Sequence, residues 1–346
     1  MLFDSTLFSL NLSRREWLRL SNAAALGGTL ALSGCGGGAM TGGTFLQAWN
    51  DQLDWTRRRW SSELKGMIEL GCTTLFLQWV GLEGESSEQW SRRGRMLQLL
   101  MEEAAKQGVS VHLGLPYNQN WWSAIHQADD RLVAGYLQMI GTNCVNYMSS
   151  VTWQRLPAFA GWYIPYEVEQ YHWGQTQPRL EMLAGWLRSL SEVAFQTSGR
   201  APTISTYCSE MASPDSLASM WAYLLDYVSV HPMIQDGVGV LGLDNYARLE
   251  PLRQMLMRRG ARFDLVVELF ERKPGTANLV GEFQAQTASI ERLRAQWDVA
   301  RNYGAERIIA FALEPWASQD TAEGRTLRSA WKLGLSRAQA TTGPLP

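Results

Sequence analysis

The fold is decided by the stretch MIELGCTTLFLQWV (residues 67–80). Its first residues continue a helical pattern in which Leu64 and Met67 lie on one face. Gly71 follows, and glycine suits the left-handed conformation with which many helices end. The run 73–80 is mostly apolar without strict alternation, which is typical of a strand covered on both faces. The stretch therefore predicts the joint between a helix and a buried strand.

The same joint recurs along the chain. Five helical patterns end at a glycine that an apolar run follows within a few residues, at Gly71, Gly108, Gly199, Gly260 and Gly304. Predicted strands lie within 45–50, 73–80, 109–118, 161–169, 202–210, 227–236, 262–271 and 307–316. Predicted helices follow them, at 55–70, around 97–105, 132–148, 180–197, 217–225, 246–259, 290–303 and 327–335.

Eight strands that alternate with eight helices predict a parallel sheet with right-handed crossovers. Units of this length fit a closed (β/α)8 barrel, or TIM barrel, as a single α/β domain. An open doubly wound sheet is the alternative, but no glycine-rich phosphate loop follows the first strand. The sequence therefore favours the barrel.

The composition excludes some classes of partner. The chain of 346 residues has a net charge of −2 and 18% charged residues, so we expect no nucleic-acid binding. Its 16 tryptophans are the unusual feature. Most are expected to fill the core, and a minority to line a cleft, where flat amphipathic rings stack on the faces of a ligand.

The N-terminus is typical of an export signal. Arg14 and Arg15 precede an apolar run, 20–32, that is too short to span a bilayer as a stable helix. The arginine pair resembles a twin-arginine signal. The run ends in LSGC (32–35), which resembles the lipobox of bacterial lipoproteins. The two signals in register predict cleavage before Cys35 and lipidation of its thiol.

These signals set the expected organisation of the chain. We expect a signal peptide at 1–34, a glycine-rich tether at 35–43 and the catalytic barrel at 44–346. The mature protein is expected on the periplasmic side of a bacterial membrane, with the outer membrane favoured. It would be held to that membrane by the lipid on Cys35.

Three further cysteines, Cys72, Cys144 and Cys208, have no metal-site spacing. We expect them to be small buried side chains, although a disulfide in an oxidising compartment stays open. The four histidines are scattered, and no HxH or HxxxH spacing occurs. We therefore expect neither a metal site nor a cofactor.

Carboxylates stand at the ends of several predicted strands. In a barrel of this type the active site lies at the C-terminal ends of the strands. Glu167 ends the fourth strand, Glu268 or Glu271 the seventh, and Glu314 the eighth. Glu268 is closer to its strand than Glu271 is. These carboxylates are the candidate catalytic groups.

The alternation of side chains along a strand indicates which of them face inward. On the fourth strand it places Tyr163, Pro165 and Glu167 inward. On the eighth strand the small side chains of Ala310 and Ala312 are expected to face inward, and Glu314 with them.

Amides, carboxylates and aromatic rings around one rim are typical of sugar binding, since hydroxyl groups need hydrogen-bond partners and the apolar sugar faces stack on rings. We expect Trp121 and Trp122 at this rim, where they would bind ligand and contribute little to stability. The predicted substrate-binding residues are Trp49, Gln78, Tyr117, Asn118, Trp121, Trp122, Tyr163, Tyr207, His231, Gln235, Asp236 and Trp316.

The strand-end glutamates resemble those of the clan A glycoside hydrolases, which are retaining enzymes with a barrel fold. That resemblance implies that Glu167 is the acid/base and Glu268 the nucleophile, although Tyr166 stands where the clan usually has Asn. GWYIPYEVE (161–169) with HPMIQDGVG (231–239) is similar to the bacterial domain-of-unknown-function 4434 family. The similarity spans about residues 44–335 and implies a barrel related to glycoside hydrolases.

Two functions fit these features. The first is a monomeric, lipid-anchored glycoside hydrolase that cleaves a bacterial poly- or oligosaccharide by a retaining two-carboxylate mechanism. The second is a noncatalytic carbohydrate-binding lipoprotein on the same barrel. An inverting mechanism stays open, as does the role of nucleophile for Glu271 or Glu314. Any one glutamate could instead cap a helix or pair with an arginine, and His231 could be a hydrogen-bonded core residue.

Overall fold

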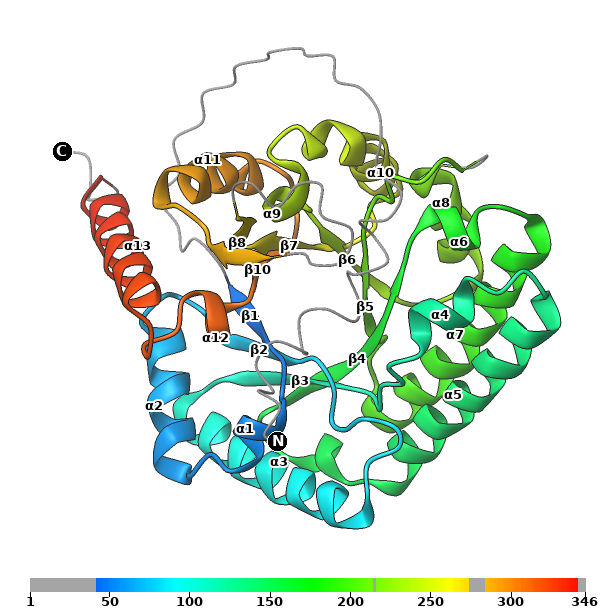
Figure 1. The fold of residues 1–346 in the computed structure, drawn as a ribbon, viewed down its shortest axis with the longest axis horizontal. Coiled ribbons are helices and arrows are strands. Elements are labelled where there is room, and N and C mark those ends of the chain that lie inside the picture. Colours follow the sequence, from blue (N-terminus) through cyan, green and yellow to red (C-terminus); the bar gives the residue numbers. More distant parts are fainter. Residues whose placement is uncertain (1–41, 214–215, 274–283, 342–346) are drawn as a thin grey trace.

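The computed structural model describes residues 42–213, 216–273 and 284–341. The expected signal peptide and Cys35 lie outside these residues, and so does most of the expected tether. Eight parallel strands close into a barrel, in which β1 pairs with both β2 and β10 (Figure 1). The strands are β1 (Gly43–Leu46), β2 (Thr74–Leu77), β3 (Ser110–Gly114), β4 (Phe159–Val168), β5 (Thr203–Thr206), β6 (His231–Gln235), β7 (Asp264–Glu268) and β10 (Arg307–Phe311). The predicted TIM barrel is confirmed.

Helices surround the barrel, as the alternation of patterns predicted (Figure 1). The longer ones are α2 (Arg57–Ile68), α3 (Ser87–Gln107), α5 (Asp130–Ser150), α7 (Gln177–Ser198), α8 (Leu217–Tyr227), α10 (Asn245–Arg259), α11 (Ile290–Arg301) and α13 (Ala322–Thr341). No helix among the described residues combines the length and the apolar character that a membrane span requires.

Short elements, which the sequence patterns did not reveal, lie in the segments that follow the strands. Apart from a 3-10 helix (Trp153–Arg155) that precedes β4, they are α1 (Asn50–Leu53), α4 (Trp121–Ile125), α6 (Gln170–Trp173), α9 (Val238–Leu241), α12 (Leu313–Trp316) and the antiparallel pair β8 (Phe270–Arg272) and β9 (Ala285–Thr287). They build the loops at the C-terminal end of the barrel, where the candidate site lies.

The helix-to-strand joints follow the chemistry of their sequence. Gly108 ends α3 with a φ of 70°, in the left-handed region that costs a residue with a Cβ extra energy. At its other end α3 begins with a capping box, in which Ser86 and Gln89 each accept from the other's backbone N–H. These two signals fix the length of the helix and hence the position of the strand that follows.

The centre of the barrel is filled by large side chains. One layer consists of Phe45, Phe76, Tyr163, Met233, Val266 and Ile309, in a cluster separate from the core between sheet and helices. Burying one such side chain contributes roughly 1.5–3 kcal/mol to stability. Side chains two positions further along each strand face the same way. This geometry brings Gln47, Gln78, Gln235 and Glu268 to the C-terminal mouth of the barrel.

The expected orientation of β10 is wrong in part. Ile309 and Phe311 pack with the interior layer, and Ala310 packs in the outer core. Only Ala312 faces the interior as expected. The prediction assumed that small side chains point inward, whereas this barrel is filled by rings and branched chains.

The cysteines largely match the expectation. Cys72 and Cys144 are buried, and Cys208 is half-buried at the end of β5. Among the described residues no disulfide joins any two of them.

Candidate active site

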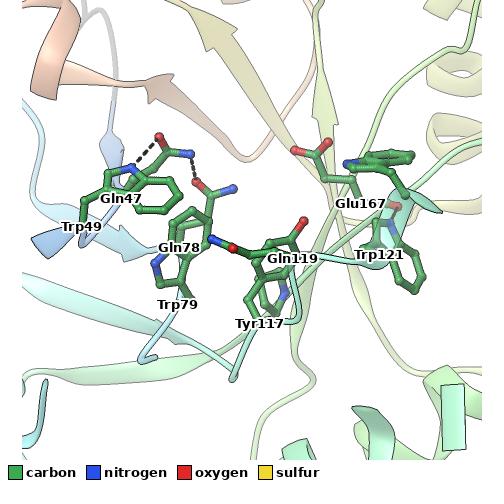
Figure 2. A pocket seen from close by; sticks show the side chains of 10 residues that line it. Gln47, Trp49, Gln78, Trp79, Tyr117, Gln119, Trp121 and Glu167 are labelled. Atoms are coloured by element: carbon green, nitrogen blue, oxygen red, sulfur yellow. Dashed lines mark hydrogen bonds between the residues drawn. The ribbon is translucent and has the colours of Figure 1, made fainter. Parts of the chain in front are cut away.

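A pocket opens at the C-terminal end of β1 to β4 (Figure 2). Six of the predicted site residues line it: Trp49, Gln78, Tyr117, Trp121, Trp122 and Glu167. Four lining residues were not among the predicted ones: Gln47, Trp79, Gln119 and Pro165. Gln47 could have been found by counting two residues on from Phe45, which faces the interior.

Glu167 is the charged group of this pocket. It is the penultimate residue of β4 and is half-buried. The ladder between β4 and β5 is irregular between Ile164 and Val168, beside Pro165, which has no N–H to donate. Such irregularities re-aim side chains at strand ends. In Figure 2 the Glu167 carboxylate faces the space between Trp121 and the glutamines.

The interior layer lies close to Glu167. Tyr163, on the same face of β4, is buried, and its hydroxyl lies 2.9 Å from Ser205 Oγ. Burial raises the pKa of Tyr163, and the negative charge of Glu167 raises it further. Tyr163 therefore supports the pocket from below rather than lining it.

Two amides and an indole form a chain of hydrogen bonds across β1 and β2 (Figure 2). Trp49 Nε1 donates to Gln47 Oε1 at 3.4 Å, and Gln47 Nε2 donates to Gln78 Oε1 at 2.7 Å. Because its oxygen is engaged in this way, Gln78 turns its NH2 group away from Gln47. The pocket thus contains a donor whose orientation is fixed by two other side chains.

The rings of Trp49, Trp79 and Tyr117 form an aromatic wall of the pocket, and contacts outside the pocket stabilise it. Trp79 stacks on Tyr117 with centroids 5.4 Å apart, and Trp49 meets Trp79 edge-on at 4.8 Å. Arg93, which is 1% exposed, donates to the carbonyl of Ala48 at 2.8 Å and pairs with Glu85. This buried arginine fixes the turn that presents Trp49.

The expectation that Trp121 and Trp122 are rim residues with little role in stability is contradicted. They are 0% and 3% exposed and belong to the outer hydrophobic core. Trp121 packs on Tyr166, with ring centroids 5.0 Å apart, and donates from Nε1 to the carbonyl of Glu167 at 3.1 Å. Trp121 and Trp122 are the first two residues of α4, which packs both rings into the core. They line the pocket as core residues.

A second group of polar side chains lies at the ends of β6 and β7. Glu268 is 2% exposed and does not line the pocket that holds Glu167. Its Oε2 accepts the N–H of Gly239 at 2.9 Å, and Arg292 Nη2 donates to its carbonyl at 2.7 Å. A Cβ on Gly239 would lie 2.8 Å from that carboxylate oxygen, so only glycine permits this contact. Gln235, also nearly buried, ends the neighbouring strand.

Asp236 lies beside Glu268 and is completely buried. Its Oδ1 accepts from the backbone N–H groups of Val238 at 3.1 Å and Glu268 at 3.3 Å. Its Oδ2 accepts from the Tyr246 hydroxyl at 3.0 Å and from the Gln296 amide. Burial, together with the charge of Glu268, raises the pKa of Asp236 to about 7, although the donors act in the opposite sense.

Two predicted residues lie away from the mouth. His231 begins β6 instead of ending it, so it lies at the N-terminal end of the barrel, with Nε2 3.2 Å from Asp264 Oδ2. Glu314, in α12, lines a separate pocket with Trp60 and Leu64 of α2, where burial raises the pKa of its carboxyl. Neither His231 nor Glu314 lines the pocket that holds Glu167.

Three other predicted residues support loops. Asn118 donates to Glu83 Oε2 at 2.6 Å and does not line the pocket. Tyr207 is buried with its ring 5.9 Å from that of Trp122. Trp316 packs on Phe270 with centroids 5.4 Å apart. No cluster of His, Cys, Asp and Glu in the described parts of the chain is arranged to hold a metal ion.

A sequence profile described as a domain of unknown function (DUF4434) matches residues 41–323. No curated protein matches the sequence. Among solved structures, a candidate alpha-L-fucosidase from Bacteroides thetaiotaomicron has a TM-score of 0.65 at 15% identity, over 92% of this chain and 99% of that one.

Two further structures share the fold. A beta-galactosidase from the psychrophilic Marinomonas ef1 has a TM-score of 0.56 at 12% identity, over 86% of this chain and 59% of that one. An endo-1,4-beta-mannanase from Rhizomucor miehei has a TM-score of 0.53 at 11% identity, over 86% and 95%. At these identities the likeness establishes the fold alone.

Proposed function

This chain belongs to the DUF4434 family, and from that premise and the pocket around Glu167 we propose that it cleaves glycosidic bonds in a poly- or oligosaccharide. One observation supports the proposal above all. Glu167 brings a carboxyl group, at the inward-facing end of β4, into a pocket of amides and aromatic rings. Such a lining suits a ligand rich in hydroxyl groups, and the carboxyl group can act on the bond between two sugars.

The proposed mechanism is retaining and uses two carboxyl groups. Glu167, as general acid, gives its proton to the leaving glycosidic oxygen while a Glu268 carboxylate oxygen bonds to the anomeric carbon. A water then attacks that carbon, Glu167 takes its proton, and Glu268 leaves as a carboxylate. Glu268 is suited to its part because the N–H of Gly239 holds its carboxylate at the mouth of the barrel.

The charge of the pocket restricts the substrate. Of the described residues that line it, Glu167 is the one charged side chain, and none is basic. A uronic acid or a sulfated sugar would bring a second negative charge next to Glu167 without a cation to compensate it. We therefore propose that the sugar bound here is neutral or carries an amine.

A noncatalytic carbohydrate-binding protein is the second candidate. The observation that favours it is the separation of environments: Glu167 lines the open pocket, whereas Glu268 is 2% exposed and lies outside that lining. In this case the aromatic wall and the oriented amides would bind sugar without turnover.

The deciding experiment measures product release from a panel of neutral, amine-bearing and acidic bacterial polysaccharides. Glu268→Gln is expected to lose activity on every substrate, because no covalent intermediate can form. Glu167→Gln is expected to lose about 10²–10⁴-fold on natural substrates but to retain cleavage of a dinitrophenyl glycoside, whose leaving group needs no proton. Glu192→Gln, on the exposed face of α7, is the matched control.

The site assignment is wrong if both variants keep wild-type turnover on a substrate that the parent cleaves. If the wild type binds a polysaccharide without releasing product, and Trp49→Ala abolishes that binding, the noncatalytic function is supported instead.

We also propose that the protein is an exported lipoprotein, anchored through Cys35 on the periplasmic side of the membrane. The support is the sequence alone, in which the Arg14-Arg15 pair and the LSGC segment stand in register.

A further inference from the structure

Asp236 has no exposed surface and four hydrogen-bond donors around its two oxygens. A carboxylate removed from water is costly unless its lone pairs are satisfied. The donors come from four segments: the turn into α9, the end of β7, α10 and α11. Four donors satisfy this one buried carboxyl group. We therefore ask what the position and the charge of Asp236 do for the residues around it.

The backbone contacts show what that position controls. Oδ1 of Asp236 accepts the N–H of Glu268 itself and the N–H of Val238, the first residue of α9. The next residue, Gly239, is the one that donates to the Glu268 carboxylate. One oxygen of Asp236 therefore ties together the backbone of Glu268 and the turn that orients its side chain.

The surroundings show why the charge of Asp236 bears on Glu268. Both carboxyl groups are buried in one site, where the repulsion between two negative charges is weakly screened. Arg292 of α11 donates to the carbonyls of Glu268 and Phe270, and burial is the main cause that lowers its pKa. The other titratable groups that act on this site are Tyr246 of α10, Tyr303 after α11 and Glu271 of β8.

We propose that Asp236 is a positioning residue that holds Glu268 at the mouth of the barrel through the backbone N–H groups of Glu268 and Val238. The role of Glu268 in catalysis rests on the proposed function, whereas the contact between the two residues does not. Burial and the charge of Glu268 raise the pKa of Asp236 to about 7, so we expect Asp236 to change charge beside Glu268 near that pH.

Asp236→Asn tests the charge with little change of shape. The asparagine oxygen can still accept from both backbone N–H groups. Its new NH2 group can donate to Gln296 Oε1, an oxygen without a hydrogen-bond partner among the described residues, once that amide rotates by half a turn. The variant is therefore expected to fold.

The first readout needs no substrate. An unfolded aspartate has a pKa of about 3.9, so between about pH 4 and pH 7 the folded wild type holds a proton that the unfolded chain has released. The stability that this proton confers is lost as the pH rises through about 7. The melting temperature of Asp236→Asn, measured relative to wild type, is therefore expected to rise by several degrees between pH 5 and pH 8.

Two tyrosine variants make the test specific. Tyr246→Phe removes a donor to the Asp236 carboxylate, so the pH at which wild-type stability falls should move upward. Tyr303→Phe is the matched control: its ring lies 5.5 Å from that of Tyr246, and its hydroxyl has no hydrogen-bond partner among the described residues. Tyr303→Phe should not change the pH at which stability falls. Tyr246→Phe also keeps the test open if Asp236→Asn does not fold.

The second readout is the pH profile of kcat/KM on any substrate that the wild type cleaves. An inflection near pH 7 is expected in the wild type and absent in Asp236→Asn. A melting difference that does not vary between pH 5 and pH 8, with the inflection unmoved in both variants, would overturn the role of Asp236. Absence of cleavage by every form of the protein would instead overturn the proposed function, and the melting curves would still decide this inference.

Discussion

At the scale of single residues, the pocket is built from side chains that also hold the fold. Trp121 has its ring in the outer core, its Nε1 bonded to the Glu167 carbonyl, and its edge on the pocket. Trp49 contributes to the same pocket but is only half-buried, at the end of a turn. Trp121 is therefore expected to contribute mainly to stability and Trp49 mainly to binding. The residue type, which is the same for both, does not reveal this difference.

This difference gives a stability prediction. Trp121→Ala is expected to lower the free energy of unfolding by about 3–5 kcal/mol, because it leaves a cavity in the core and removes the hydrogen bond to the Glu167 carbonyl. Trp49→Ala is expected to lower the free energy of unfolding far less than Trp121→Ala does. It is expected to weaken sugar binding at least as strongly as Trp121→Ala. Chemical denaturation of both variants, with calorimetric titration of a bound oligosaccharide, measures the two effects. Equal stability losses would show that Trp49 is also a core residue.

At the scale of elements, the strands and long helices could be predicted because each carries its own signal. A glycine with positive φ ends a helix, as at Gly108, and the short apolar run that follows predicts a covered strand by its length. The orientation of β10 could not be predicted, since it depends on which side chains fill the centre of the barrel. Ile309 faces inward because the rings from other strands leave space for it, and the β10 sequence does not contain that information.

The residues of the candidate site, like the elements of the fold, could be predicted only in part. Glu167 followed from the alternation along β4, and Gln47 would have followed from the same count on β1. His231 was misplaced because the start of β6 was predicted four residues too early, at residue 227, whereas β6 begins at His231 itself. The burial of Glu268 depends on α9 and β8, short elements without a periodic signal, and so could not be read from the sequence.

The contact between the ends of β1 and β2 gives the next prediction. Gln47→Met keeps the volume of the side chain but removes both hydrogen bonds that set the orientation of Gln78 and Trp49. Since a hydrogen bond contributes about 0.5–1.5 kcal/mol net, the affinity for a bound sugar is expected to fall about 2- to 15-fold. Gln138→Met, on the exposed face of α5, is the control. Unchanged affinity in Gln47→Met would mean that Gln78 does not contact the sugar.

At the scale of the whole molecule, the barrel places the two proposed catalytic carboxyl groups, Glu167 and Glu268, at one end. The mouth contains the Glu167 pocket and the Asp236–Glu268 pair, and the opposite end contains His231 with Asp264 and Arg307. The proposed lipid on Cys35 would hold the barrel near a membrane surface through the segment that precedes β1.

The anchor makes the last prediction. Cys35→Ser removes the thiol that would carry the lipid, so the protein is expected to move from the membrane fraction to the soluble periplasmic fraction. Cys208→Ser, which alters a half-buried thiol of the barrel, should leave it in the membrane fraction. Arg14→Lys with Arg15→Lys should keep the chain in the cytoplasm, because twin-arginine export depends on the arginine pair and not on charge alone. Normal export of the double lysine variant would rule out this route, and a membrane-bound Cys35→Ser variant would rule out the lipid.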